Sequence, residues 1–304
     1  MTTTEPAILA AAPIHQIVDV DGIPMSALMI EAQNPRAVIL AIHGGATSSA
    51  YYDCPGHPRS SLMRTAAALG FTVLALDRPG YGSSLPYADQ LTSAQARVDI
   101  AYAALDLHLG SRPRGVGVFI WGHSIGCELA TRLAADDRGD ALLGIELSGT
   151  GLEQQPAAKA VLGTMATNAD PKAVRELLWQ PSRIYPPELV GGGPIASRGP
   201  SFEGAVVRAW PHQDFPALAP RVKIPLHFTA AEFENVWRGD PEALNDIAAM
   251  FTAAPRVVLK EQFDSGHNLS LGNTAMAYHL EVLSFFEECI ESRSRALAAQ
   301  EVGK

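Results

Sequence analysis

Cysteine and long apolar runs are scarce in this sequence. The three cysteines, Cys54, Cys127 and Cys289, suggest no disulfide framework and match no zinc-binding spacing. No apolar run reaches the roughly 18 residues needed to span a bilayer. Residues 1–13 lack the basic start and apolar core of a secretion signal. We therefore expect a cytoplasmic protein with no membrane span, no metal and no organic cofactor.

Positive charge is also in short supply. The chain has 23 lysines and arginines against 32 acidic residues, a formal net charge of -9. Its arginines are scattered rather than clustered, so we do not expect nucleic acid as a partner. Hydrophobic residues nevertheless make up 47% of the 304 residues. That content supports a substantial core in one large domain or a domain with an insertion. Nothing in the sequence indicates the oligomeric state.

Apolar strand patterns alternate with helical patterns along most of the chain. Continuous apolar runs are typical of strands buried on both faces, and amphipathic spacing is typical of helices packed on a sheet. This alternation predicts an α/β fold with a mostly parallel central sheet and helices on both faces. Strands are expected at 37–42, 71–76, 116–121, 142–147, 224–229 and 256–259, after a hairpin of 15–20 and 25–30. Helices are expected at 61–69, from a Thr92–Gln95 capping box to Leu109, after Ser124, and at 276–290.

Residues 151–220 interrupt this rhythm. They contain helical patches at 157–165 and 172–179 but no convincing strand. So long an excursion from a compact domain is more often functional than a plain connection. We therefore divide the chain into a tail (1–14), a core (15–150 and 221–298) and a helical cap insertion (151–220).

The segment Gly122-His123-Ser124-Ile125-Gly126 fits the pattern G-x-S-x-G. A buried strand leads into it, and apolar positions at helical spacing follow it. Strand, tight turn and helix together are the context of a nucleophile elbow, so we predict that Ser124 is a nucleophile. The alternative is a glycine-rich turn in which the serine only caps the helix.

A second glycine segment, His43-Gly44-Gly45-Ala46, follows the strand at 37–42. Backbone N–H groups in such a loop, together with the one after the nucleophile, stabilise the negative oxygen of a tetrahedral intermediate. We predict that Gly45 and Ile125 supply these two donors and that His43 orients the loop. The alternative is an ordinary loop that needs glycine for its backbone conformation.

A serine nucleophile needs a base, and histidine suits that role at neutral pH. Of nine histidines, only His267 lies in a late loop between a strand and the closing helix. A carboxylate that orients its imidazole is expected after the strand at 224–229. Glu234 is our first choice for this acid and Glu232 the second. Asp214 and Glu146 are more remote alternatives.

From about His15 to Ile290, the sequence resembles the α/β-hydrolase superfamily. The motifs that carry the resemblance are residues 43–45 (HGG), 77–84 (DRPGYGSS), 122–126 (GHSIG) and 266–268 (GHN). The family's usual Gly-x-x-Asp after the acid strand reads Ala-Glu-Phe-Glu at 231–234. The resemblance implies the α/β-hydrolase fold, and a serine rather than an aspartate nucleophile argues against haloalkane dehalogenase and epoxide hydrolase activity.

Three functions are compatible with these residues. The first is hydrolysis of a carboxylic ester, lactone or thioester through an acyl-enzyme. The second uses the same site for acyl transfer, C–C bond hydrolysis or a lyase reaction. The third is a non-catalytic small-molecule binding protein, because fold alone does not define function.

The substrate is expected to be a small molecule with an apolar acyl group. Aromatic residues are frequent in the cap, and they suit such a ligand, although they could equally pack the cap's own core. The residues expected to contact substrate are Gly44, His123, Trp179, Trp210 and Trp237.

Overall fold

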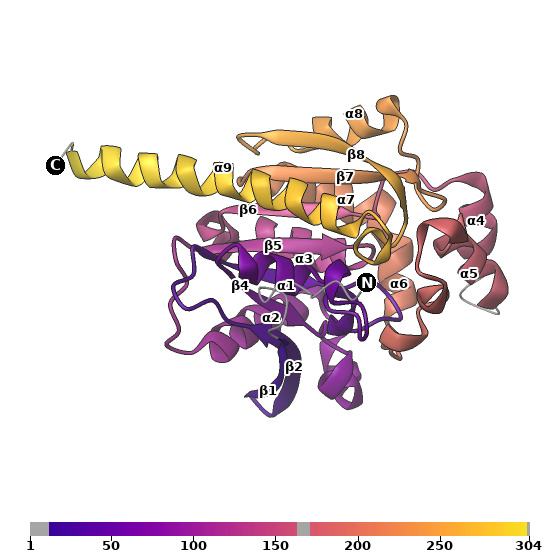
Figure 1. Cartoon of the computed structure of the whole chain (residues 1–304), viewed down its shortest axis with the longest axis horizontal. Helices are drawn as coiled ribbons and strands as arrows, with labels where there is room; N and C mark the ends of the chain where they lie inside the picture. The colour runs from indigo at the N-terminus through magenta and orange to yellow at the C-terminus, as the bar shows by residue number, and fades with distance from the viewer. Residues whose placement is uncertain (1–11, 163–170, 303–304) are drawn as a thin grey trace, which may run out of the picture.

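A computed structural model describes residues 12–162 and 171–302, and an eight-stranded sheet runs through this part of the chain (Figure 1). The strand order is β1-β2-β4-β3-β5-β6-β7-β8. β2 pairs antiparallel with β1 and β4, whereas every other neighbouring pair is parallel. The strands are β1 (Ile14–Val20), β2 (Ile23–Ile30), β3 (Ala37–Ile42), β4 (Phe71–Leu76), β5 (Val118–His123), β6 (Gly144–Ser148), β7 (Leu226–Phe233) and β8 (Val257–Gly266). The expected mostly parallel sheet and its opening hairpin are confirmed.

The apolar runs of the sequence form the centre of this sheet. All six residues of β3, of β4 and of β5 are buried. Parallel strands covered by helices on both faces have no solvated side, so apolar residues fill them without alternation. The parallel strands also end at one common edge, where the loops that follow them meet.

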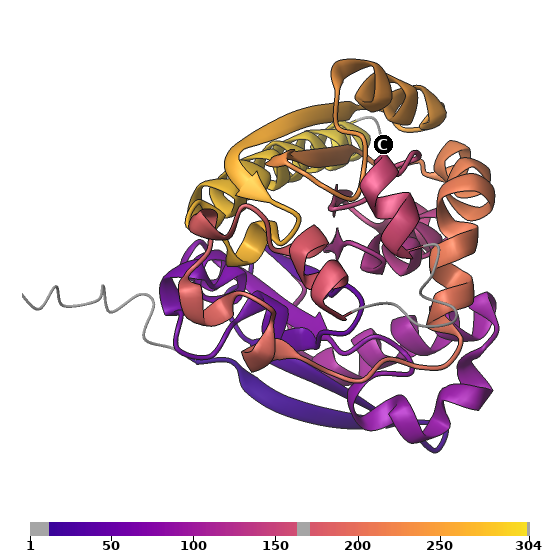
Figure 2. The same cartoon turned by 90° about the vertical axis from the view of Figure 1, so that its right-hand side faces the viewer.

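Helices cover both faces of the sheet, as expected (Figure 2). α1 (Leu62–Ala68) and α9 (Ala275–Val302) share one apolar cluster with one face. α2 (Ala94–Leu109), α3 (Gly126–Ala135) and α8 (Pro241–Met250) share another cluster with the opposite face. The ring of Phe286 in α9 stacks on Phe119 in β5, with ring centroids 4.0 Å apart. Two separate cores therefore hold the sheet between layers of helices.

A helical insertion joins β6 to β7. It contains α4 (Pro156–Leu162), α5 (Pro171–Leu178), α6 (Glu203–Ala209) and α7 (Phe215–Leu218). Figure 1 shows α4, α5 and α6 together at one end of the molecule, while α9 runs out at the opposite end. The helices expected at 157–165 and 172–179 correspond to α4 and α5, although residues 163–165 lie outside the described part. No strand is found in the described residues of this insertion.

The expected Thr92–Gln95 capping box is wrong by one position. Ser93 is the N-cap of α2, and its side chain accepts from the N–H of Ala96 at 3.5 Å. Thr92 has helical backbone angles (φ -68°, ψ -31°) because it ends the preceding 3₁₀ segment, whereas Ser93 has the extended angles that an N-cap requires. The Gln95 side chain instead donates to Asp99.

Two elements extend further than the sequence pattern indicated. β8 continues to Gly266, and α9 is 28 residues long and ends at Val302. Within residues 12–162 and 171–302, no helix is both long enough and apolar enough to cross a membrane.

His279 in α9 is a buried imidazole in an apolar setting. It is fully buried beside Trp121 of β5, and neither ring nitrogen has a hydrogen-bond partner among the described residues. Burial disfavours the charged ring and lowers its pKa to about 3. The unfolded chain binds a proton at this group near pH 6.5, so the folded state loses relative stability as pH falls from 6.5 towards 3.

We predict that His279→Phe removes this dependence on pH. The free energy of unfolding of the wild type, relative to the variant, should be smaller at pH 5 than at pH 7.5 by about 2 kcal/mol, because the unfolded wild type binds an extra proton. Urea unfolding of both proteins at the two pH values measures the difference. A difference that is the same at both pH values would contradict the prediction.

Candidate active site

Ser124 lies in a strained turn between β5 and α3. Its φ of 52° is in the left-handed region, which costs a non-glycine residue about 1 kcal/mol or more. Two hydrogen bonds hold the turn: the N–H of Ser124 donates to the carbonyl of Ser148 at 2.8 Å, and its own carbonyl accepts from Cys127 at 2.9 Å. The β5 strand, the turn and the α3 helix are the local structure expected from the sequence.

The two glycines beside Ser124 allow a close approach of the backbone. A Cβ atom on Gly126 would lie 2.4 Å from the carbonyl oxygen of His43, and one on Gly122 would lie 2.8 Å from the Cβ of Ala130. Neither distance is possible for a real side chain. Neither glycine is among those with a positive φ, so the two are needed for packing of α3 against the sheet.

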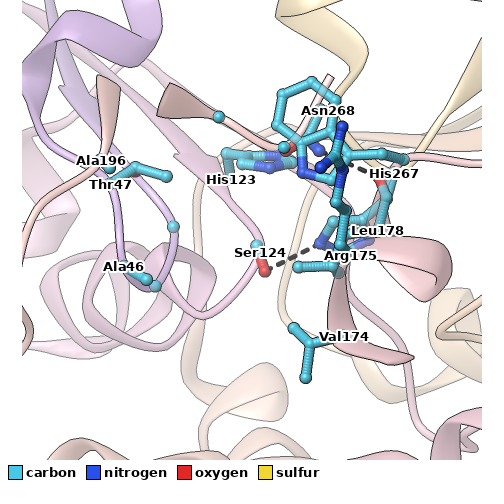
Figure 3. Close-up of a pocket in the computed structure, with 15 residues that line it drawn as sticks. Ala46, Thr47, His123, Ser124, Val174, Arg175, Leu178, Ala196, His267 and Asn268 are labelled. Carbon is cyan, nitrogen blue, oxygen red and sulfur yellow. Dashed lines mark hydrogen bonds between the residues drawn. The ribbon is translucent and has the colours of Figure 1, made fainter. Parts of the chain in front are cut away.

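His267 contacts Ser124 directly. Its Nε2 lies 3.1 Å from the Oγ of Ser124 (Figure 3), and only 4% of its surface is exposed. The residue follows Gly266, the last residue of β8. Its Nδ1 lies 3.0 and 3.1 Å from the two carboxylate oxygens of Glu234. Ser124, His267 and Glu234 thus form one continuous line of hydrogen bonds.

Glu234 and Glu232 lie in different surroundings. Glu234 follows the end of β7, is buried, and also accepts from the N–H of Val236 at 2.8 Å. Glu232 is exposed within β7 and accepts from the N–H of Asp264 at 2.7 Å. The structure therefore brings Glu234, and not Glu232, to the imidazole of His267.

The two remote acids have other partners. Asp214 pairs with Arg132 at 2.7 Å. Glu146 lies fully buried in β6, 2.6 Å from the Nδ1 of His227. Neither has a hydrogen bond to His267.

The glycine loop after β3 lies beside the serine. A Cβ atom on Gly44 would be 3.0 Å from the Cβ of Ser124, and one on Gly45 would be 3.4 Å from the Cγ2 of Ile125. No hydrogen bond joins the N–H of Gly45 or of Ile125 to another residue of the described chain. Two unpaired backbone donors therefore flank the serine side chain.

His43 holds this loop as a neutral ring. The N–H of Arg78 donates to its Nε2 at 3.0 Å, so Nδ1 carries the hydrogen and donates to the carbonyl of Gly44 at 2.8 Å. Burial and then the charge of Arg78 lower the pKa of His43 to about 4. Protonation of Nε2 would break the hydrogen bond from the N–H of Arg78, so the structure of the loop requires the neutral ring.

His123 is a second buried imidazole beside the serine. It stacks on Tyr51, with ring centroids 4.3 Å apart. Burial, followed by the nearby His267, lowers its pKa well below the usual value. The ring is therefore neutral and belongs to the wall of the site.

An open cavity of about 190 Å³ adjoins Ser124 (Figure 3). Of the residues expected at the site, Gly44, Gly45, His123, Ser124, Trp179 and His267 line it. Its remaining lining comes from the same glycine loop, the loop after β8 and the insertion between β6 and β7: Ala46, Thr47, Val174, Arg175, Leu178, Gly191, Gly192, Ala196 and Asn268.

Trp210 and Trp237 do not line this cavity. Trp210 is buried, stacks on Phe215, and donates from its indole nitrogen to Thr150 at 2.8 Å. Trp237 packs against Gly151 and is 7% exposed. Both rings join the insertion to the core. Both therefore have a packing role, and their contact with substrate stays a prediction.

Arg175 and Leu178 of α5 also line the cavity but were not predicted from the sequence. Arg175 is the one lysine or arginine among the described cavity-lining residues, and it donates to the carbonyl of Val190 at 3.1 Å. Val174 and Leu178 lie four residues apart and so share one helix face, which was the available signal.

Among the described residues, no group of three or more histidine, cysteine or acidic side chains could hold a metal ion.

Residues 38–277 match the alpha/beta hydrolase family, and this span covers most of the chain. The chain therefore belongs to that family, which confirms the resemblance carried by its motifs and the fold class. A comparison with curated proteins found no match.

Solved structures of the same fold include several enzymes. A thermostable carboxyl esterase from Bacillus coagulans is 18% identical, with 92% of this chain and 99% of that chain covered and a TM-score of 0.64. The thioesterase domain from the curacin biosynthetic pathway is 19% identical, with 90% and 100% covered and a TM-score of 0.58. Proline iminopeptidase from Mycobacterium smegmatis is 16% identical, with 92% and 99% covered and a TM-score of 0.64. At these identities the likeness extends to the fold alone.

We predict that Gly126→Ala destabilises the protein, because the new Cβ would collide with backbone oxygens at the end of β3. Overpacking of this kind should cost about 2–3 kcal/mol, or roughly 5–10 °C in Tm. Gly193→Ala is the matched control, since a Cβ there meets nothing within 4 Å. Thermal unfolding of the two variants tests the prediction. Equal Tm values for both would contradict so close an approach of α3 to β3.

Proposed function

We propose that this protein is a serine hydrolase that cleaves a carboxylic ester, lactone or thioester through an acyl-enzyme. The observation that carries the proposal is the line of hydrogen bonds from Ser124 through His267 to Glu234, beside an open cavity. Family membership agrees with this activity. Two of the structures with this fold are a carboxyl esterase and a thioesterase domain, and they support the bond type.

In the proposed first half-reaction, Ser124 attacks the carbonyl carbon of the substrate. As its Oγ forms the new bond, the Nε2 of His267 takes the hydroxyl proton. Glu234 accepts from Nδ1–H, which keeps the imidazole in the required tautomer and stabilises the imidazolium. The negative oxygen of the tetrahedral intermediate accepts hydrogen bonds from the N–H groups of Gly45 and Ile125.

The intermediate then collapses. The carbonyl re-forms, the C–O or C–S bond to the leaving group breaks, and the imidazolium returns its proton to the departing alcohol or thiol. In the second half-reaction His267 takes a proton from water, whose oxygen attacks the acyl carbon of the ester on Ser124. The second tetrahedral intermediate then collapses: the bond between the acyl carbon and Oγ breaks, the imidazolium returns its proton to Oγ, and the carboxylic acid leaves.

The insertion, residues 151–220, is proposed to act as a cap that selects the acyl group. Val174, Leu178 and Trp179 are apolar residues from the insertion in the cavity lining. They support the apolar acyl group expected from the sequence, because apolar walls favour apolar ligands. A cavity of about 190 Å³ suits a short acyl chain.

We predict that Ser124→Ala removes hydrolysis of p-nitrophenyl acetate and butyrate. The value of kcat should fall by about 10,000-fold or more, because the nucleophile is lost while the fold is kept. Release of p-nitrophenolate, followed by absorbance, measures the rate, and circular dichroism checks the fold. Turnover that survives in Ser124→Ala would contradict the proposal.

Two other outcomes would indicate a different function. Faster p-nitrophenolate release with an added alcohol, together with formation of the new ester, would identify acyl transfer. An absence of turnover in the wild type, combined with tight binding of a small molecule, would favour a binding protein.

We predict that Glu234→Gln lowers kcat by about 100- to 10,000-fold, because an amide cannot orient and charge-stabilise the imidazole. Glu232→Gln is the matched control. Its amide oxygen can still accept from Asp264, so kcat should stay within about two-fold of wild type. Steady-state kinetics on one ester measure both. A larger loss in Glu232→Gln than in Glu234→Gln would overturn the assignment.

A further inference from the structure

The loop that carries Gly45 is strained at its next residue. Ala46 has a φ of 54°, a left-handed conformation that a non-glycine residue adopts only when its surroundings impose it. The Gly45 N–H belongs to the same peptide unit as the Gly44 carbonyl, and Ala46 is the next residue of the chain. Whatever holds Gly44 and Ala46 on either side therefore also sets one of the two proposed oxyanion donors.

Two segments far apart in the sequence hold Ala46. Its N–H donates to the hydroxyl of Tyr81 at 3.0 Å, and its carbonyl accepts from the N–H of Ser197 at 3.0 Å. Tyr81 is fully buried, whereas Ser197 belongs to the insertion. An isolated β-bridge between Thr47 and Ala196 continues the contact. The insertion therefore touches the glycine loop directly.

One carboxylate of the insertion binds both side chains beneath this loop. Glu203, the first residue of α6, accepts from the hydroxyl of Tyr81 and from the guanidinium of Arg78. Arg78 also donates to the carbonyl of Gly44 at 3.0 Å. The Arg78 and Glu203 side chains are only 8% and 16% exposed. Glu203 is thus linked by hydrogen bonds to Gly44 through Arg78. It is linked in the same way to Ala46 through Tyr81.

The negative charge of Glu203 lies near the proposed oxyanion site, so its pairing with Arg78 affects how that site receives a negative oxygen. A Cβ atom on Gly45 would lie 3.4 Å from a carboxylate oxygen of Glu203. An unpaired carboxylate beside Gly45 would repel a negative oxygen forming at the Gly45 N–H. The guanidinium of Arg78 neutralises it, so the pair can hold the loop without opposing the charge.

We propose that Glu203 is a positioning residue: with Arg78 and Tyr81 it fixes the glycine loop so that the Gly45 N–H meets the oxyanion. Through Glu203 the insertion takes part in the reaction beyond selecting substrate. This inference rests on the proposed hydrolase function. It predicts an asymmetry, because loss of the carboxylate only loosens the loop, whereas loss of the guanidinium also exposes a negative charge.

A double-mutant cycle tests this asymmetry with p-nitrophenyl butyrate. In Glu203→Gln, kcat should fall about 10-fold with KM within about two-fold, because the defect lies in transition-state binding. In Arg78→Met, kcat should fall about 100-fold or more, since a bare carboxylate then faces the oxyanion. The double variant should recover to a value between those of Arg78→Met and Glu203→Gln, because it carries no unpaired carboxylate but lacks the Arg78 bond to Gly44. Glu188→Gln, an exposed acid of the same insertion, is the control and should match wild type.

The inhibition constant of butylboronic acid separates positioning from general loss of structure. Its tetrahedral adduct on serine uses the oxyanion donors, so its inhibition constant should rise in step with the loss of kcat in each variant. If Arg78→Met does not fold, Tyr81→Phe replaces it and should lower kcat with the same rise in the boronate constant. Unchanged kcat and unchanged boronate inhibition in Glu203→Gln would overturn the inference.

The two proposals fail in different ways. Ester turnover that survives in Ser124→Ala would remove the proposed function and this inference with it. Turnover that depends on Ser124 but is indifferent to Glu203 would remove this inference alone. A double variant no faster than Arg78→Met would also contradict it, because removal of the unpaired charge would then bring no recovery.

Discussion

The strained backbone of Ser124 is the constraint on which the rest of the site depends. A serine at φ 52° persists because β5 and α3 clamp it and because Gly126 lets α3 lie against the end of β3. Since the parallel strands end at one edge, the loops after β7 and β8 bring Glu234 and His267 to the same place. The chemistry proposed here follows from this convergence of four strand ends on one hydroxyl group.

The core of the fold could be predicted because its signals are local. Strands buried on both faces are continuous apolar runs, and the glycines around Ser124 mark a close approach of helix and strand. The choice of Glu234 over Glu232 was also within reach. Glu232 still belongs to β7, where its carboxylate accepts from the backbone of the neighbouring chain segment, whereas Glu234 follows the strand end and faces His267.

Features that depend on distant partners could not be predicted. Trp210 and Trp237 are aromatic residues of a kind that often lines binding sites, yet both pack between the insertion and the core. Only the three-dimensional packing distinguishes the two roles. The N-cap of α2 is Ser93 rather than the expected Thr92, because the preceding 3₁₀ segment determines the backbone conformation of Thr92. Glu203 has no motif at all. Its partners lie more than a hundred residues earlier in the chain, so only the fold brings them together.

Covalent labelling with a fluorophosphonate, followed by peptide mapping, probes the pairing of Ser124 with His267 itself. The reagent reacts with a serine hydroxyl that a nearby imidazole has activated, so it reports the geometry of Ser124 and His267 without knowledge of the substrate. One adduct per chain is expected, on the peptide that contains Ser124. An unlabelled protein, or an adduct on another serine, would contradict it.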